Sequence, residues 1–363
     1  MASLKIQTSL LVLYANLYMA TLCHSFCLPE EHTALFIFGD SMFDVGNNNY
    51  INTTTDMQAN FWPYGETSFK YPTGRPSDGR LIPDFIAEYA KMSFIPPYLQ
   101  PGYHQYTDGA NFASAGAGAL IETNRGMVID LKSQLKHFIE VEKLVKLELG
   151  DTEARRLLSR ALYLFSIGSN DYLAPFISNS TTLQKHPIEV YVNMVIGNLT
   201  TEIKKGGRKF GFLNLPPLGC LPVMKALVPG TKDGCLEEAT KFTQLHDDAL
   251  RKVLQYQETR LKGFQYSYID FYSSYSERMN NPSKYGFKEG NIACCGGGPY
   301  KGFQSCGGKR SVKEFELCED VEEYVIFDAV HPTEKTYQQI AELMWNGDHE
   351  VAGPYNLREL YES

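Results

Sequence analysis

The 363-residue sequence has no internal repeat, no polar linker and, after residue 22, no long uncharged apolar run. A helix that crosses a bilayer needs about 20 consecutive apolar residues, so we expect no transmembrane segment in the mature protein. Because nothing divides the chain, we expect one folded unit, and the 23 Tyr and 21 Phe residues supply ample material for its core.

Clusters of positive charge are also missing. The formal net charge is −8 and the pI is near 5.6, whereas proteins that bind a phosphate backbone use basic patches. The short basic turn from Lys204 to Lys209 is better explained as a solvated helix end. We therefore expect no nucleic-acid partner.

Two familiar hydrolase signatures are absent as well. The sequence contains neither G-x-S-x-G, which presents the serine of α/β-hydrolases, nor H-E-x-x-H, which binds zinc in many peptidases. A serine nucleophile in this chain must therefore use a different geometry.

The N-terminus has the three-part layout of a secretory signal peptide. Lys5 precedes a mainly apolar stretch from residue 10 to 22, which Asn16 interrupts, and compact residues follow around 23–27. We predict that residues 1–27 are the signal peptide, with an approximate cleavage site, and that the protein is secreted.

Six cysteines remain after the predicted signal peptide: Cys220, Cys235, Cys294, Cys295, Cys306 and Cys318. An even number in a secreted chain favours disulfide bonds. We expect Cys220 to pair with Cys235, because only fourteen residues of a Pro- and Gly-containing loop separate them. A zinc site is the alternative, but it usually shows a C-x-x-C spacing that this chain lacks.

Three N-x-S/T triplets fit export. Asn52, Asn179 and Asn198 are candidate glycosylation sites if they are exposed in the folded chain, although such triplets also arise by chance.

Short apolar runs alternate with helical patterns along the chain. The runs predict buried strands at residues 34–38, 110–113, 162–167, 209–213, 266–271 and 324–327. Three- and four-residue spacing of apolar positions predicts helices at residues 81–92, 128–149, 188–205, 236–261 and 334–345. This alternation predicts a parallel sheet covered on both faces, in a three-layer α/β arrangement.

The first predicted strand leads into Ser41, at the sheet edge where ligands collect in such folds. If a helix follows, its N–H groups and dipole would favour a developing oxyanion, provided that a base removes the hydroxyl proton. The alternative is that Ser41 caps a helix, a common role for serine.

The last predicted strand ends just before Asp328, and His331 and Pro332 follow. In a turn leaving the strand, Asp328 could hold one ring nitrogen of His331 and leave the other to face a serine. The alternative is that Asp328 ends the strand and Pro332 begins the helix, with His331 exposed between them.

Two further strand ends carry an amide and small residues. Asn170 would bring an amide donor to the same edge, although a simple turn also explains the sequence around it. Gly116 and Gly118 permit close backbone approach and could direct an N–H into a site. A dinucleotide-binding loop is the alternative for these glycines, but the third glycine of that fingerprint is missing.

Taken together and in this order, the four segments resemble the GDSL esterase/lipase family, also called SGNH hydrolases, in its plant secreted branch. The resemblance covers nearly the whole mature chain. Its blocks are Gly39-Asp40-Ser41 with Phe43-Asp44-Val45-Gly46-Asn47-Asn48, Asn111-Phe112-Ala113 through Gly116, Gly168-Ser169-Asn170-Asp171, and Asp328-Ala329-Val330-His331-Pro332. Each block alone is weak, whereas their ordered combination is specific.

The resemblance implies a role for each site residue. Ser41 would be the nucleophile, His331 the base and then the acid, and Asp328 the carboxylate that orients His331. The Ser41 N–H, the Gly116 N–H and the Asn170 amide would form the oxyanion hole. Met42 stands where the family name has leucine, a swap of similar volume that should affect packing slightly and catalysis hardly at all.

The resemblance also implies a flavodoxin-like α/β/α sandwich with about five parallel strands, formed as one domain by residues 28–363. It implies hydrolysis of small-molecule or lipid esters, with acyl or acetyl groups, through an acyl-enzyme and without a metal or organic cofactor. It implies export to the extracellular space, which in a plant is the apoplast or cell wall.

Two alternatives to a lipase-type esterase remain open at this point. The first is a non-catalytic extracellular protein that uses the cleft to bind a ligand, since a fold does not fix a function. The second is a carbohydrate O-deacetylase, which differs in acyl length and leaving group. The aromatic-rich stretches 50–71 and 97–106 could line an acyl groove or simply pack.

Overall fold

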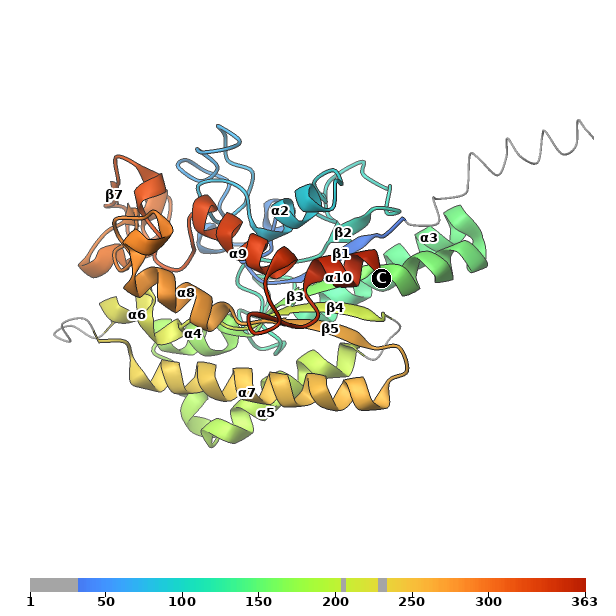
Figure 1. Ribbon diagram of the computed structural model, residues 1–363. Helices are drawn as coiled ribbons and strands as arrows, with labels where there is room; N and C mark the ends of the chain where they lie inside the picture. Colours follow the sequence, from blue (N-terminus) through green and yellow to red (C-terminus); the bar gives the residue numbers. More distant parts are fainter. Residues whose placement is uncertain (1–31, 204–206, 228–233) are drawn as a thin grey trace, which may run out of the picture.

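The computed structural model describes residues 32–203, 207–227 and 234–363 (Figure 1). The predicted signal peptide, residues 1–27, lies outside the described residues, as does the start of the basic turn at 204–206.

A sheet of five parallel strands with one added antiparallel strand forms the centre of the fold (Figure 1). The parallel strands lie in the order β2-β1-β3-β4-β5, which is the flavodoxin-like order. The predicted parallel α/β sheet of about five strands is therefore confirmed. The strands are β1 (Leu35–Gly39), β2 (Gly109–Asn111), β3 (Leu162–Ser166), β4 (Lys209–Leu213), β5 (Gln265–Ile269) and the antiparallel β8 (Ala352–Pro354).

Aromatic rings fill the core beside the central strands. Phe165 stacks between Phe38 and Phe212, with ring centroids 4.9 Å and 5.4 Å away. The strands β1, β3 and β4 are buried along their whole length. Because both faces of a parallel sheet are covered, their sequences are apolar throughout instead of alternating.

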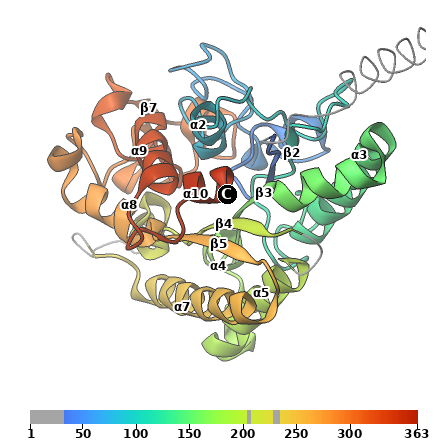
Figure 2. The ribbon, with the colours of Figure 1, turned by 45° about the vertical axis from the view of Figure 1, so that its right-hand side comes forward.

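Helices cover both faces of the sheet, as the two views in Figure 1 and Figure 2 show. α5 (Ile188–Ile203) and α7 (Glu237–Arg260) lie on one side. On the other side lie α2 (Ile82–Tyr89), α9 (Glu334–Asn346) and α10 (Leu357–Glu362). The fold is thus a three-layer sandwich, with one helical layer on each face.

The five predicted helices are present, with some changes at their ends. α3 (Leu131–Arg160) runs past the predicted end at residue 149, because a second helical stretch follows Gly150, whose φ of 77° is not helical. The patterns did not predict α4 (Ser169–Ile177), α6 (Pro222–Ala226), α8 (Phe271–Asn280) or α10. The interpretation of residues 168–171 as a simple turn is wrong, since α4 begins at Ser169.

The predicted strand at residues 324–327 is also wrong. These residues make only isolated bridges, one between Glu289 and Tyr324 and one between Ile326 and Pro332. Ile326 and Phe327 are fully buried, and their carbonyl groups accept hydrogen bonds from the N–H groups of Cys294 and Cys295. The apolar run correctly predicts that this segment is buried, but the segment packs against the irregular loop around Cys294 and Cys295 and not in the central sheet.

Three disulfide bonds use all six cysteines of the described chain: Cys220–Cys235, Cys294–Cys318 and Cys295–Cys306. The pairing expected of Cys220 with Cys235 is present. Because the thiols of these six cysteines are all oxidised, none of them is left as a thiolate to bind zinc, and the zinc alternative is wrong. The other two disulfides cross-link residues 294–318, which contain the small two-stranded sheet of β6 (Cys295–Gly296) and β7 (Glu316–Leu317).

The loops contain short 3₁₀ helices: η1 (Asn47–Tyr50), η2 (Thr55–Met57), η3 (Thr181–Lys185), η4 (Leu218–Cys220), η5 (Pro282–Tyr285), η6 (Pro299–Lys301), η7 (Cys306–Gly308) and η8 (Val321–Glu323).

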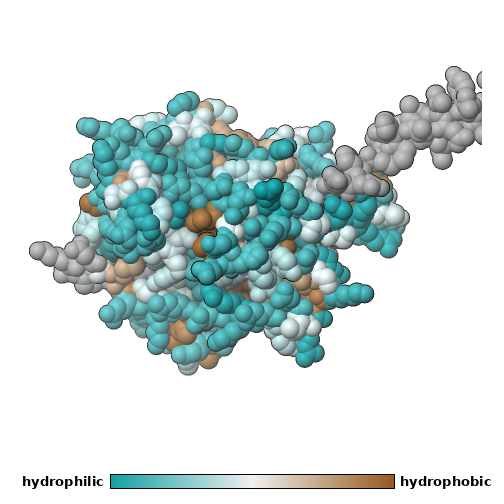
Figure 3. Space-filling model, in the orientation of Figure 1, coloured by the Kyte–Doolittle hydropathy of each residue, from teal (hydrophilic) through white to brown (hydrophobic). Residues whose placement is uncertain are grey.

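Within the described residues, no helix is long and apolar enough to cross a membrane. The face drawn in Figure 3 is mainly polar, with apolar residues in small separate groups.

Candidate active site

Four segments far apart in the sequence meet at the carboxyl edge of the sheet. Ser41 follows β1, Gly116 lies in the loop after β2, and Asn170 is in the first turn of α4, directly after β3. These three strands are neighbours in the sheet. His331 comes from the loop before α9, and all four residues line one cavity of about 170 Å³.

Ser41 stands in a tight turn and not at the start of an α-helix. The N–H groups of Phe43 and Asp44 donate to the carbonyl oxygen of Asp40, at 3.1 Å and 3.0 Å, and the N–H of Met42 donates to the Asp40 carboxylate. The interpretation of Ser41 as a helix cap is therefore wrong, and because no helix follows Ser41 directly, a helix dipole does not act on it. The turn instead projects the hydroxyl group toward His331.

A chain of hydrogen bonds joins the serine to a carboxylate. Ser41 Oγ lies 2.8 Å from His331 Nε2, and His331 Nδ1 lies 2.9 Å from Asp328 Oδ1 and 3.0 Å from Oδ2. Asp328 Oδ1 also accepts the N–H groups of Val330 and His331, at 2.9 Å and 2.8 Å. The interpretation of His331 as a merely exposed residue before a helix is wrong, because its ring is engaged on both sides.

The glycine and the amide lie on the other side of the hydroxyl group. Gly116 has a φ of +84°, and a Cβ atom there would stand 2.4 Å from Met57 Sδ, so only glycine fits. Within the described chain, no group accepts a hydrogen bond from the N–H of Ser41 or of Gly116. The Asn170 amide donates one hydrogen to Ala117 O at 2.9 Å, which leaves its second hydrogen for the cavity.

Gly118 is not part of this arrangement. A Cβ atom at position 118 would stand 2.4 Å from Asp171 Oδ1 and 2.6 Å from Thr123 Cβ, so Gly118 permits close packing and does not face the cavity. This acidic neighbour also disfavours a phosphate and with it the dinucleotide alternative.

Residues 35–344 match the family described as GDSL-like Lipase/Acylhydrolase. The chain belongs to this family. It is 53% identical over 343 residues to GDSL esterase/lipase 2 from Arabidopsis thaliana, covering 92% of this chain and 91% of the relative. It is 49% identical over 365 residues to a GDSL lipase from Tanacetum cinerariifolium, covering 99% and 96% of the two chains.

A third relative, named an inactive GDSL esterase/lipase-like protein 25 of Arabidopsis thaliana, is 37% identical over 330 residues, covering 90% of this chain and 74% of that protein. The family resemblance seen in the four blocks is thereby confirmed. As a GDSL esterase/lipase, the chain is a carboxylic ester hydrolase that acts on small-molecule esters.

Two asparagines of the first GDSL block tie it to the second. The Asn47 amide donates to Asn111 O and Ala113 O, both at 2.8 Å, and the Asn48 amide donates to Ala115 O at 2.9 Å. Both asparagines are buried. They fix the loop that carries Gly116 relative to the turn that carries Ser41.

The carboxylate of Asp328 is ionised although it is buried. Burial alone would raise its pKa, but the His331 ring, the charge of Arg310 and the Tyr64 hydroxyl together hold the pKa of Asp328 well below its usual range. An ionised carboxylate at this position can accept the Nδ1 hydrogen of His331.

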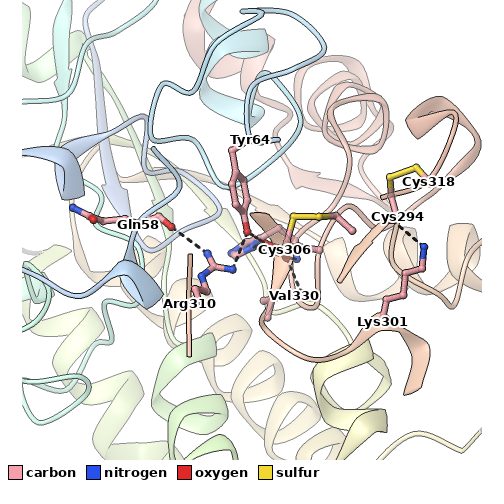
Figure 4. The surroundings of a disulfide bond; sticks show 11 residues. Gln58, Tyr64, Cys294, Lys301, Cys306, Arg310, Cys318 and Val330 are labelled. Carbon is pink, nitrogen blue, oxygen red and sulfur yellow. Dashed lines mark hydrogen bonds and ion pairs between the residues drawn. A yellow bond between two sulfur atoms is a disulfide. The ribbon is translucent and has the colours of Figure 1, made fainter. Parts of the chain in front are cut away.

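Tyr64 and Arg310 lie behind Asp328, and no sequence pattern indicated either of them. The Tyr64 hydroxyl donates to Asp328 Oδ2 at 2.7 Å and accepts from Arg310 Nη1 at 2.9 Å. Figure 4 shows Arg310 reaching between Tyr64 and Gln58, whose carbonyl oxygen it contacts at 3.1 Å. Tyr64 is 264 residues away from Asp328 in sequence, so only the folded chain reveals the contact.

The cavity wall has an apolar and a polar part. Leu173, Ala174 and Ile177 of α4 form an apolar side, and Asp56, Gln58 and Gln304 are among the polar residues opposite. No aromatic residue of the stretches 50–71 and 97–106 lines it. Some of those aromatic side chains pack, as Tyr64 does against Phe61 and Phe327, whereas Tyr50, Trp62 and Tyr71 are exposed.

Among the described residues, no group of three or more His, Cys, Asp or Glu side chains is arranged to hold a metal ion. The candidate glycosylation residues Asn52, Asn179 and Asn198 are all exposed.

Proposed function

We propose that this GDSL protein is a secreted serine esterase in which Ser41 attacks the ester carbonyl carbon, with His331 as the base and Asp328 as the orienting carboxylate. The observation that carries this proposal is the unbroken run of hydrogen bonds from Ser41 Oγ through His331 to Asp328, with heavy-atom distances between 2.8 Å and 3.0 Å. Such distances allow direct proton transfer.

In the first half of the reaction, Ser41 Oγ bonds to the carbonyl carbon while His331 Nε2 takes the hydroxyl proton. Asp328 stabilises the resulting imidazolium and holds Nδ1–H toward itself. The tetrahedral intermediate collapses when His331 returns the proton to the alkoxide oxygen of the leaving alcohol. The acyl group is then bonded to Ser41 as an ester.

In the second half, water enters the position that the alcohol has left. His331 Nε2 removes a proton from the water, the resulting oxygen bonds to the acyl carbon, and Ser41 leaves with a proton from His331. The products are the free acid, the alcohol and the unchanged enzyme.

The oxyanion of both tetrahedral intermediates would be held by the N–H groups of Ser41 and Gly116 and by the Asn170 amide. These donors are fixed by the sheet edge and by the loop that Asn47 and Asn48 tie down, so they need no rearrangement as charge develops.

The test is hydrolysis of nitrophenyl acetate, butyrate and longer esters by the protein made in a host that forms disulfides. Ser41→Ala should abolish turnover, whereas Ser93→Ala, at an exposed serine, should leave it unchanged. A folded wild-type protein that hydrolyses none of these esters would contradict the proposal and favour a non-catalytic binding protein. A Ser41→Ala variant with full activity would contradict it by showing that Ser41 is not the nucleophile. Activity confined to acetyl esters would instead favour the O-deacetylase alternative.

Export is supported by the predicted signal peptide, the three disulfides and the exposed Asn52, Asn179 and Asn198. After expression in a secreting plant or insect cell, the protein should be in the medium, begin near residue 28 and lose mass on enzymatic removal of N-linked glycans. Retention of the intact chain inside the cell would contradict export.

A further inference from the structure

Two buried side chains, Tyr64 and Arg310, lie behind Asp328, and of the two only Arg310 also lines the cavity. The Tyr64 side chain is 1% exposed and does not line the cavity. Its hydroxyl donates to Asp328 Oδ2 and accepts from Arg310 Nη1, so a single hydroxyl group connects the anion to a buried cation.

We propose that Tyr64 and Arg310 are positioning residues of the triad, which fix the carboxylate of Asp328 so that His331 stays aligned with Ser41. This inference rests on the proposed esterase mechanism and adds two residues on which its rate depends.

The need for the Tyr64 hydroxyl follows from how the two carboxylate oxygens are used. Oδ1 accepts from two backbone N–H groups and from His331 Nδ1, whereas Oδ2 has Tyr64 as its one donor besides His331 among the described residues. The terminal torsion of an aspartate is broad. Without the Tyr64 bond, Oδ2 is free to rotate away from the ring, and the imidazole loses part of its restraint.

Arg310 places a positive charge near Asp328 although its own hydrogen bonds reach only neutral groups. It is 6% exposed, and its hydrogen bonds go to the Tyr64 hydroxyl and to the carbonyl oxygens of Gln58 and Thr55, all neutral groups. A buried cation is costly unless an anion compensates it. Asp328 lies directly beyond Tyr64, and Arg310 is among the groups that lower its pKa.

The disulfide-linked segment brings Arg310 to this position. Arg310 is four residues after Cys306, which is bonded to Cys295, and the Cys295 N–H donates to Phe327 O at 2.7 Å, one residue before Asp328. One buried cluster contains Cys295, Cys306, Tyr64 and Phe327. Figure 4 shows the disulfide of Cys306 beside Tyr64 and Arg310. The carboxylate and its support are therefore parts of one cross-linked unit.

The decisive variant is Tyr64→Phe, which removes one oxygen atom and keeps the packed ring. Loss of a hydrogen bond to a charged group should lower kcat about 10- to 100-fold, and KM should stay within about twofold, because Tyr64 does not line the cavity. The matched control is Tyr275→Phe. Tyr275 is equally buried, but its hydroxyl has no hydrogen-bond partner in the described chain, so its loss should leave kcat unchanged.

A second pair of variants separates the charge of Arg310 from its shape. Arg310→Met removes the charge, so Asp328 loses a buried cation that favours its ionised form, and kcat should fall about 10-fold. Arg310→Lys keeps a charge and should restore kcat toward the wild-type value.

The outcomes distinguish this inference from the proposed function. If Ser41→Ala is inactive and folded Tyr64→Phe keeps the kcat of Tyr275→Phe, the positioning role is overturned and the esterase mechanism stands. If Tyr64→Phe does not fold, the kcat values of Arg310→Met and Arg310→Lys decide, and identical kcat values overturn the role. If Ser41→Ala keeps full activity, the mechanism itself fails.

Discussion

The two halves of the site are built in different ways. Ser41, Gly116 and Asn170 follow three adjacent parallel strands, and Asn47 and Asn48 tie the Gly116 loop to the Ser41 turn. Asp328 and His331 stand in an irregular loop that is attached to residues 294–318 and backed by Tyr64 and Arg310. The half with the proposed nucleophile, called the nucleophile half below, thus depends on a regular sheet. The half with the proposed base, called the base half, depends on cross-links and buried polar contacts.

The largest effect should come from the base half. Asp328→Asn keeps the shape of the side chain but presents an amide to the His331 ring, which favours the wrong tautomer, so kcat should fall about 10⁴-fold. The measurement is nitrophenyl butyrate hydrolysis, with circular dichroism to show that the variant is folded. A loss of less than tenfold would mean that His331 does not depend on this carboxylate.

Within the nucleophile half, Asn170→Ala should lower kcat about 10²- to 10³-fold with little change in KM, since one oxyanion donor is lost. Asn193→Ala, at an exposed position of α5, is the control and should keep full activity. Equal kcat values for the two variants would remove Asn170 from the oxyanion hole.

Disulfide removal tests the difference between the halves directly. Replacing either Cys295 and Cys306 or Cys220 and Cys235 by alanine should lower the free energy of unfolding by about 2–4 kcal/mol in urea titrations. Only the first replacement should also lower kcat of the folded protein at low temperature, because that disulfide precedes Arg310 and adjoins Phe327. Equal kcat values for both double variants would show that the cross-link is not needed for the base half.

The pH dependence of the unfolding free energy should include a contribution from Asp40, which is next to Ser41 in the nucleophile half. Burial raises the pKa of Asp40 to about 7, so the folded chain keeps this proton while the unfolded chain, with a pKa near 3.8, loses it. The unfolding free energy should therefore fall by about 2 kcal/mol between pH 5 and pH 7 on account of Asp40. Asp40→Asn should remove that part of the decrease in denaturant titrations, and an unchanged pH dependence would contradict the assignment.

The smallest effect should follow Met42→Leu. The swap preserves volume, and the stability cost should stay below about 1.5 kcal/mol. The Tyr337 hydroxyl, which contacts Met42 Sδ at 3.5 Å, loses a weak acceptor. Turnover should be unchanged, and a loss of more than tenfold would show that the turn around Ser41 is sensitive to its packing.

Sequence predicted the nucleophile half better than the base half. The predicted strands at residues 34–38 and 162–167 are short apolar runs, and polar residues follow both of them closely in sequence, so Ser41 and Asn170 could be assigned to the edge of the sheet. Asp328 and His331 were found by their spacing, although the strand expected before them does not exist. The apolar run at 324–327 correctly indicated buried residues, but it could not indicate that they pack against the loop around Cys294 and Cys295.

Other features depend on long-range contacts that no local pattern encodes. Tyr64 and Arg310 meet across 246 residues, and Asp171 accepts hydrogen bonds from the N–H groups of Ala119 and Leu120 and thereby holds the loop beside the cavity. Short helices such as α4 and α8 were missed because Gly168 and Asp270, the residues before them, are equally common in turns.

The hydrogen bond between Ser41 and His331 joins residues that are 290 positions apart. During synthesis, the strand and turn that present the serine leave the ribosome long before its base does. If His331 activates Ser41 as proposed, a partly made or truncated chain carries the serine without its base. Catalytic activity would then show that the chain has been made and folded at least as far as His331.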